Sequence, residues 1–158
     1  LIVFIDLGWP IIYKHRYPGL NEKNFTMYRF RTMINKRDEK GHLLNPVQRL
    51  TKIGAFLKKY SLDDLPELFN ILKGDMSFVG PRPVLIRAIP SKERIRIKRH
   101  SVRPGLTGWS QIQGHKSLTW EQKFKLDLYY VEHQSLRLDL KIILISILQF
   151  FGLFLHLV

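Results

Sequence analysis

The chain has 158 residues, of which 45% are hydrophobic and 12% aromatic, so it is long and apolar enough for one domain with a core and is not a disordered tail. It carries 26 Lys and Arg against 13 Asp and Glu. The formal net charge of +13 predicts anionic partners, namely phosphate-bearing substrates, nucleic acid or an anionic membrane surface. The absence of cysteine excludes disulfides, thiolate zinc sites and a cysteine nucleophile.

Two segments near the N-terminus predict the strands of a β-hairpin with a Pro-Gly turn between them. They are "PIIYKHRY" (10–17) and "FTMYRFRTM" (25–33). Side chains alternate between the two faces of a strand. One face of the second segment therefore holds four side chains: Phe25, Met27, Arg29 and Arg31.

A polar loop and a helix are expected after the hairpin. Residues 34–46 are mostly polar and include a glycine and a proline, which is typical of a loop. Residues 47–59 predict one helix, because their apolar residues recur at helical spacing. The positions of this stripe are Val47, Leu50, Ile53, Gly54 and Leu57.

The stretch "YSLDDLPELFNILKGDMSFVGPRP" (60–83) predicts a helix over about 64–73. Asp64 suits the N-cap and Glu67 the N3 position of a capping box in acidic form, while Gly74 suits the position just after the helix. The apolar residues of the segment form a helical stripe: Leu65, Leu68, Phe69 and Leu72.

The second half of the chain predicts mostly helix. In chain order we expect a loop with short extended pieces over 75–91, a basic helix over 91–100, a strand over 107–113, a helix over 118–132 and a last helix from about 136. The expected apolar face of the helix over 118–132 is Trp120, Phe124, Leu128 and Val131.

The C-terminal segment 142–158 has 17 residues without a formal charge, at the lower limit for a helix that spans a bilayer. Polar residues interrupt it, so an interfacial helix, a buried helix and a spanning helix all stay open. Taken together, the elements predict an α+β fold: a compact, helix-rich single domain over 1–158 with a small β-hairpin or sheet and amphipathic membrane-associated helices.

The adjacent acids Asp63 and Asp64 have two interpretations. Acids are preferred near the start of a helix, so capping alone explains them. They also lie in sequence between Lys58 and Arg82, and carboxylates hold Mg²⁺ together with substrate phosphates while cations neutralise those phosphates. An aspartate can also attack phosphorus as a nucleophile. Spacing alone leaves both interpretations open.

Four segments occur in the order found in one known family. They are "YRFRTM" (28–33), "SLDDLPELFNILKGDMSFVGPRP" (61–83), "RPGLTGWSQIQG" (103–114) and "DLYYVEHQSLRLDLKIIL" (127–144). Over about residues 9–148 the chain resembles the bacterial sugar transferases known as monotopic phosphoglycosyl transferases. The family's membrane-inserting hairpin precedes these segments, and we expect it to be lacking here, where only "LIVFIDLGW" stands ahead of them.

The resemblance implies a reaction and its partners. Such enzymes transfer a sugar-1-phosphate from a nucleotide diphosphate sugar, usually a UDP-sugar, to polyprenyl phosphate, and they release UMP. The step initiates the synthesis of a surface polysaccharide or glycan at the cytoplasmic face of the bacterial inner membrane. The implied cofactor is Mg²⁺, and membrane lipid is a further partner, whereas nucleic acid is not.

The resemblance also assigns roles to residues. Asp63 corresponds to the nucleophile beside the metal, and Asp64 to its acid-base or supporting partner, where the family usually has a glutamate. The residues implied to bind substrate phosphate are Arg82, Arg103, Lys58, Arg29 and Arg31.

Two other functions compete with this one. A non-catalytic, membrane-associated relative that binds lipid phosphate, or assembles with polysaccharide-synthesis proteins, would also explain the charge and the aspartate at position 64. A nucleic-acid-binding protein is favoured only by the charge and by the basic run over 92–103, which lacks a recognition motif.

Overall fold

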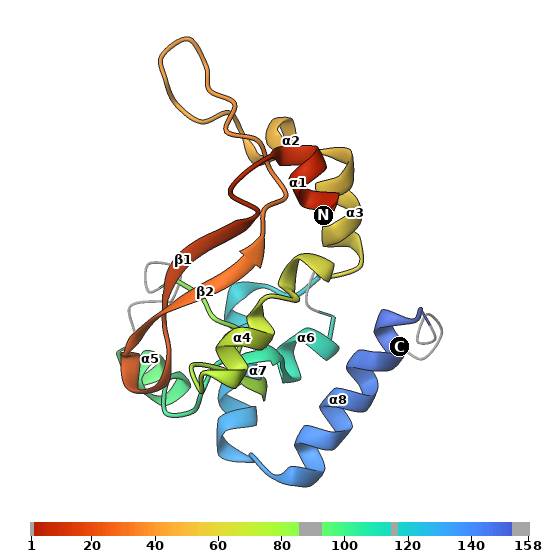
Figure 1. The fold of residues 1–158 in the computed structure, drawn as a ribbon. Helices are drawn as coiled ribbons and strands as arrows, with labels where there is room; N and C mark the ends of the chain where they lie inside the picture. Colours follow the sequence, from red (N-terminus) through yellow and green to blue (C-terminus); the bar gives the residue numbers. More distant parts are fainter. Residues whose placement is uncertain (1, 86–92, 115–116, 153–158) are drawn as a thin grey trace. The chain divides into compact units, whose positions relative to one another are not determined.

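The computed structural model describes residues 2–85, 93–114 and 117–152. Its strands are β1 (Ile12–Pro18), β2 (Asn24–Phe30), β3 (Ser77–Val79) and β4 (Gly105–Thr107). Its α-helices are α1 (Ile2–Leu7), α2 (Pro46–Arg49), α3 (Lys52–Lys59), α4 (Glu67–Leu72), α5 (Glu93–Arg99), α6 (Trp109–Ile112), α7 (Trp120–Glu132) and α8 (Leu136–Phe150). The helices outweigh two small sheets, so the predicted α+β class is confirmed (Figure 1).

The chain divides into two compact units. The first comprises Leu1–His15 and Met27–Leu68, and the second comprises Arg16–Thr26 and Phe69–Val158. The single domain expected over 1–158 stays a prediction.

The predicted hairpin is confirmed. Strands β1 and β2 form a two-stranded sheet, and a short 3-10 helix (Leu20–Glu22) connects them after the Pro-Gly turn. Phe25 and Met27 are buried, as the alternation of the strand predicts, and Arg29 follows them on the same face. The hairpin thus brings an arginine into a partly buried setting in the first unit.

The single helix expected over 47–59 is wrong, because two helices occupy this region. Leu50 is extended, with φ −70° and ψ 123°, and it forms an isolated bridge with Met33. Thr51 then caps α3, since its side-chain oxygen accepts from the backbone N–H of Gly54 over 2.8 Å. Side-chain capping competes with helix continuation, so threonine begins a second helix here.

The helix expected over 64–73 begins later than predicted, at Glu67. Residues Leu62–Asp64 form one 3-10 turn instead, and Ser61 ahead of them adopts a left-handed conformation, with φ 51°. Pro66 has no N–H to donate into a preceding turn, which favours the separation of the two helices. Gly74 follows α4 with φ +78°, as expected for a glycine at that position.

The apolar stripe of this segment lies on the exposed side. Leu65, Leu68, Phe69 and Leu72 are 38–83% exposed, so the expectation that such a stripe faces a core is wrong here. Three buried positions are instead polar and recur every three residues, namely Asp64, Glu67 and Asn70, and Asp63 and Pro66 are buried as well. The segment therefore buries polar side chains and exposes apolar ones, the reverse of what is usual for a helix in a globular domain.

In the second unit, β3 and β4 pair in parallel, with Ser77 opposite Gly105 and Val79 opposite Thr107. The strand expected over 107–113 is wrong, since β4 ends at Thr107 and α6 follows it. A Cβ atom at Gly105 would lie 2.1 Å from the backbone nitrogen of Gly80. Glycine at 105 therefore permits the close approach that forms this small sheet.

The core of the second unit joins β3 to the last three helices through Val79, Ile112, Tyr130 and Ile142. The buried face of α7 is Phe124, Asp127 and Tyr130. The predicted face of that helix is confirmed for Phe124, which is buried, and for Val131, which packs against the core, but it is wrong for Trp120, which is 51% exposed. The helices expected over 91–100 and from 136 correspond to α5 and α8, although residues 91–92 lie outside the described residues.

Helix α8 has 15 residues and ends at Phe150. Among the described residues, no helix combines the length and the apolar character needed to cross a membrane. The last six residues of the segment 142–158 lie outside the described residues.

Candidate active site

The adjacent acids Asp63 and Asp64 occupy the 3-10 turn that separates α3 from α4 in the first unit. Although both are charged residues, they are only 8% and 9% exposed. A carboxylate buried to this extent is costly unless it is paired, protonated or bound to a cation. The turn therefore holds two acids that a cation or a proton would stabilise, and such buried ionisable groups are candidates for a functional site.

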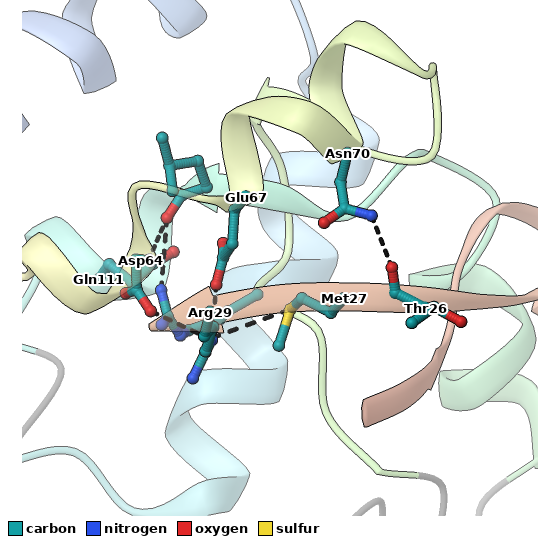
Figure 2. A network of polar contacts seen from close by, with 9 residues as sticks. Thr26, Met27, Arg29, Asp64, Glu67, Asn70 and Gln111 are labelled. Atoms are coloured by element: carbon teal, nitrogen blue, oxygen red, sulfur yellow. Dashed lines mark hydrogen bonds and ion pairs between the residues drawn. The ribbon is translucent and has the colours of Figure 1, made fainter. Parts of the chain in front are cut away.

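The side chain of Arg29, in β2, contacts two carboxylates, those of Asp64 and Glu67. Its Nε lies 3.1 Å from Asp64 Oδ1 and donates over 2.7 Å to Glu67 Oε1 (Figure 2). Glu67 is fully buried, and the side chain of Arg29 is 23% exposed. The network fixes Asp64 and Glu67 with a charge-assisted contact each, and it ties the start of α4 to the hairpin.

The carboxylate of Asp63 differs from that of Asp64 in its ion-pair contacts. Within the parts of the chain that the structure describes, its carboxylate forms no ion pair. Burial raises the pKa of Asp63, and the negative charge of Asp64 raises this pKa further, while Lys58 and Arg29 act in the opposite direction. Such a group has a raised affinity for a proton or another cation.

The structure brings four of the predicted site residues together in the first unit, namely Asp63, Asp64, Arg29 and Lys58. Lys58 lies exposed in the last turn of α3, and its charge lowers the pKa of Asp63. Arg29 bridges Asp64 and Glu67. One cation near the acidic turn thus comes from α3, next to the turn in sequence, and the other from β2, far from it in sequence.

Arg31 is placed differently from the other cations of the first unit. Its guanidinium donates to the backbone carbonyls of Leu7 and Pro10, the latter over 2.8 Å. The printed contacts of Arg31 are thus with the segment at the end of α1, where a cation also complements the helix dipole. Its predicted role in phosphate binding stays a prediction.

Arg82 and Arg103 belong to the second unit. Arg82 lies in the loop after β3, and its Nη1 approaches the carbonyl of Leu106 at 3.4 Å. Arg103 is exposed, and its Nε donates over 2.9 Å to the carbonyl of Gly74. Each arginine contacts a backbone carbonyl and lies next to proline, which restricts the backbone there; its predicted role in phosphate binding stays a prediction.

Glu67 is the site residue that sequence reasoning assigned only to helix capping. The signal that could have identified it is the three-residue spacing of Asp64, Glu67 and Asn70, which separates three polar side chains from the apolar stripe of the same segment. Asn70 itself donates from Nδ2 to the carbonyl of Thr26 over 2.7 Å in the second unit (Figure 2).

Buried adjacent carboxylates flanked by arginine and lysine, in an α+β chain of high positive charge, are typical of enzymes that act on phosphorylated substrates. The family comparison agrees with this class. A family model described as bacterial sugar transferase matches residues 1–152, and the chain belongs to this family of enzymes.

Several relatives carry names that state a reaction or a pathway. The chain is 48% identical over 146 residues to the uncharacterized sugar transferase EpsL of Bacillus subtilis, covering 92% of this chain and 72% of EpsL. It is 37% identical to the exopolysaccharide production protein ExoY of Rhizobium meliloti, covering 90% of this chain and 70% of ExoY. A UDP-glucose:undecaprenyl-phosphate glucose-1-phosphate transferase of Xanthomonas campestris is 36% identical, and the match covers 90% of this chain but 32% of that protein.

Proposed function

We propose that this protein transfers a sugar-1-phosphate from a nucleotide diphosphate sugar, most simply a UDP-sugar, to polyprenyl phosphate. The names of relatives that use undecaprenyl phosphate support the acceptor and the phosphosugar group. The reaction would release UMP and initiate the synthesis of a surface polysaccharide. The observation that carries the proposal is the buried Asp63 beside an Asp64 that Arg29 already holds.

In the proposed first step, a carboxylate oxygen of Asp63 attacks the phosphorus next to the sugar. The bond from this phosphorus to the bridging oxygen breaks, and UMP leaves with that oxygen. In the second step, an oxygen of polyprenyl phosphate attacks the same phosphorus, and the Asp63 carboxylate is released as polyprenyl diphosphate sugar forms. The two displacements predict ping-pong kinetics.

The neighbours of Asp63 have separate tasks in this scheme. Arg29 holds the Asp64 carboxylate 3.1 Å from its Nε and thereby orients the acid next to the nucleophile. Lys58 contributes positive charge at the mouth of the turn, which favours the ionised form of Asp63 and the approach of a phosphate. Preorganised charges of this kind stabilise the charge that develops on oxygen during phosphoryl transfer.

The donor set around Asp63 fits Mg²⁺, which usually takes one or two carboxylates and completes its shell with water and substrate phosphates. Among the described residues, no cluster of three or more His, Asp or Glu side chains is arranged to hold a metal ion. A Mg²⁺ ion bound by Asp63 and by the phosphates of the substrate would not need such a cluster. When bound, Mg²⁺ would supply positive charge that neutralises the phosphates and keeps Asp63 ionised.

We further propose that the protein works at the cytoplasmic face of the bacterial inner membrane. The exposed apolar side chains of the α4 segment support a lipid-facing surface there, as do those of α8: Leu136, Leu140, Leu144, Ile147 and Phe150. The net charge of +13 would add attraction to anionic lipid, at about 1 kcal/mol for each basic residue near the surface.

The test is UMP release from a panel of UDP-sugars with Mg²⁺ and polyprenyl phosphate in detergent or membranes. Asp63→Asn is expected to abolish release. Asp38→Asn makes the same chemical change on an exposed loop and is expected to retain it. Release that survives Asp63→Asn would refute the mechanism. Salt-sensitive vesicle binding without any release would favour the non-catalytic lipid-binding alternative.

A further inference from the structure

The second unit contains a buried ion pair that the proposed reaction does not use. Arg99 at the end of α5 is 2% exposed, and its Nε donates over 2.8 Å to Oδ2 of Asp127 in α7, which is 3% exposed. Ser110 donates to the other oxygen, Oδ1, over 2.7 Å. A buried ion pair is weak evidence for stability, because apolar residues of similar volume often serve a core as well. The pair therefore points to another role.

The same guanidinium reaches the loop that carries Arg82. Its Nη2 donates to the backbone carbonyl of Arg82. Further backbone contacts hold this loop to β4, since Gly80 N–H donates to the Thr107 carbonyl over 2.9 Å and Gly105 N–H donates to the Pro81 carbonyl over 3.1 Å. The side chain of Arg82 contacts the Leu106 carbonyl at 3.4 Å, near the limit for a hydrogen bond. Three hydrogen bonds thus hold the backbone of the loop, two to β4 and one to Arg99.

Only an arginine can make both of these contacts at once. Its Nε and Nη2 donors point in fixed directions, so an acceptor on Nε orients the donor on Nη2. Asp127, itself oriented by Ser110, is that acceptor. A lysine at position 99 would keep the charge beside Asp127, but a single ammonium on a flexible stem would not reproduce the fork.

We propose that Arg99, oriented by Asp127, is a positioning residue that fixes the backbone of the loop 80–83 and thereby presents Arg82 to a phosphate of the nucleotide sugar. The inference rests on the proposed function for the identity of the ligand. It also gives a role to one arginine of the basic run over 92–103.

The experiment compares Arg99→Lys with Lys98→Gln in the full chain. Lys98 is a matched control, because it also joins α5 to α7, through an exposed ion pair with Glu132 that does not involve the loop. Thermal unfolding first establishes that each variant is folded. Amide hydrogen exchange then follows the N–H groups of Gly80 and Gly105, and UMP release gives kcat and the KM for the nucleotide sugar.

Arg99→Lys is expected to speed exchange at the two glycines and to raise the donor KM about tenfold, the size expected for the loss of one charge-assisted hydrogen bond. Lys98→Gln is expected to change neither. In an Arg82→Ala background, Arg99→Lys is expected to raise KM no further, because the group being positioned is gone.

Three results would overturn the inference. Unchanged exchange at Gly80 and Gly105 would show that Arg99 does not fix the loop, whatever the activity. An equal rise in KM with and without Arg82 would show a structural effect unrelated to that arginine. If the unaltered chain releases no UMP, the proposed function is refuted. The exchange rates at Gly80 and Gly105 would still show whether Arg99 fixes the loop, so the two failures can be distinguished.

Discussion

Replacing Gly54 with alanine tests how α3 is held in the first unit. Alanine is the better helix former by about 1 kcal/mol, so an exposed glycine in a helix would gain stability from this change. Gly54 is buried, and a Cβ atom there would lie 2.0 Å from the carbonyl oxygen of Thr32 and 2.8 Å from its carbonyl carbon. Both contacts are with backbone, which cannot rotate away, and the same carbonyl accepts from Thr51 N–H.

The expected change in the free energy of unfolding combines the gain in helix propensity with the cost of the clash with the Thr32 backbone. Forcing extra atoms into a packed site costs about 1–3 kcal/mol, and a clash with backbone belongs at the upper end, about 3 kcal/mol. Subtracting the gain of about 1 kcal/mol in helix propensity leaves a net loss of about 2 kcal/mol. For a chain of this length, that loss lowers Tm by about 4–8 °C. Because α3 leads directly into the acidic turn, UMP release should fall as well.

Thermal and urea unfolding of Gly54→Ala provide the measurement. The exposed neighbour Ala55 supplies the control, since Ala55→Gly in the same helix reports the propensity term alone, expected at about 1 kcal/mol. A Gly54→Ala variant as stable as the unaltered chain, or more stable, would refute the argument that Thr32 and Gly54 are in backbone contact.

Three further outcomes are expected. Asp63→Asn should raise Tm at pH 7, because the raised pKa of Asp63 means that its ionised carboxylate is unfavourable in the folded state. The gain in Tm should shrink as the pH falls through this raised pKa and vanish below the ordinary value of 3.8, and a gain that persists in acid would contradict the raised pKa of Asp63. Thr119→Ala removes the capping box of α7, in which Thr119 and Gln122 bond reciprocally, and urea titration should show a loss of about 1 kcal/mol. Tyr130→Phe deletes a buried hydroxyl that donates to Asp139 over 2.8 Å and should cost about 1–3 kcal/mol by the same titration, whereas an unchanged midpoint would mean that the bond contributes nothing.

The α+β class, the hairpin and most helices could be predicted from the sequence, because they depend on local patterns. Alternation of apolar residues in β2, the cap residues ahead of α7 and α8, and the glycine after α4 each act within a few residues. The four ordered segments also predicted the family, which the family model confirms. The acidic pair Asp63 and Asp64 belongs to that local information.

The partners of the acids depended on tertiary structure. Arg29 lies 38 residues before Glu67, and nothing in the local sequence indicates that one arginine bridges Asp64 and Glu67. The buried pair of Arg99 and Asp127 is likewise formed between two helices, and it reaches a third segment at Arg82. Contacts between residues far apart in the chain depend on packing, which periodicity does not report.

The chain also shows where local patterns mislead. The stripe of Leu65, Leu68, Phe69 and Leu72 has the spacing of a core-facing helix, yet it is exposed, and the polar face of the same segment is buried. The sequence by itself determined that this segment is amphipathic. Only the tertiary structure decided which face is covered, because a buried ion-pair network with Arg29 can hold a polar face inward as firmly as apolar packing holds a hydrophobic one.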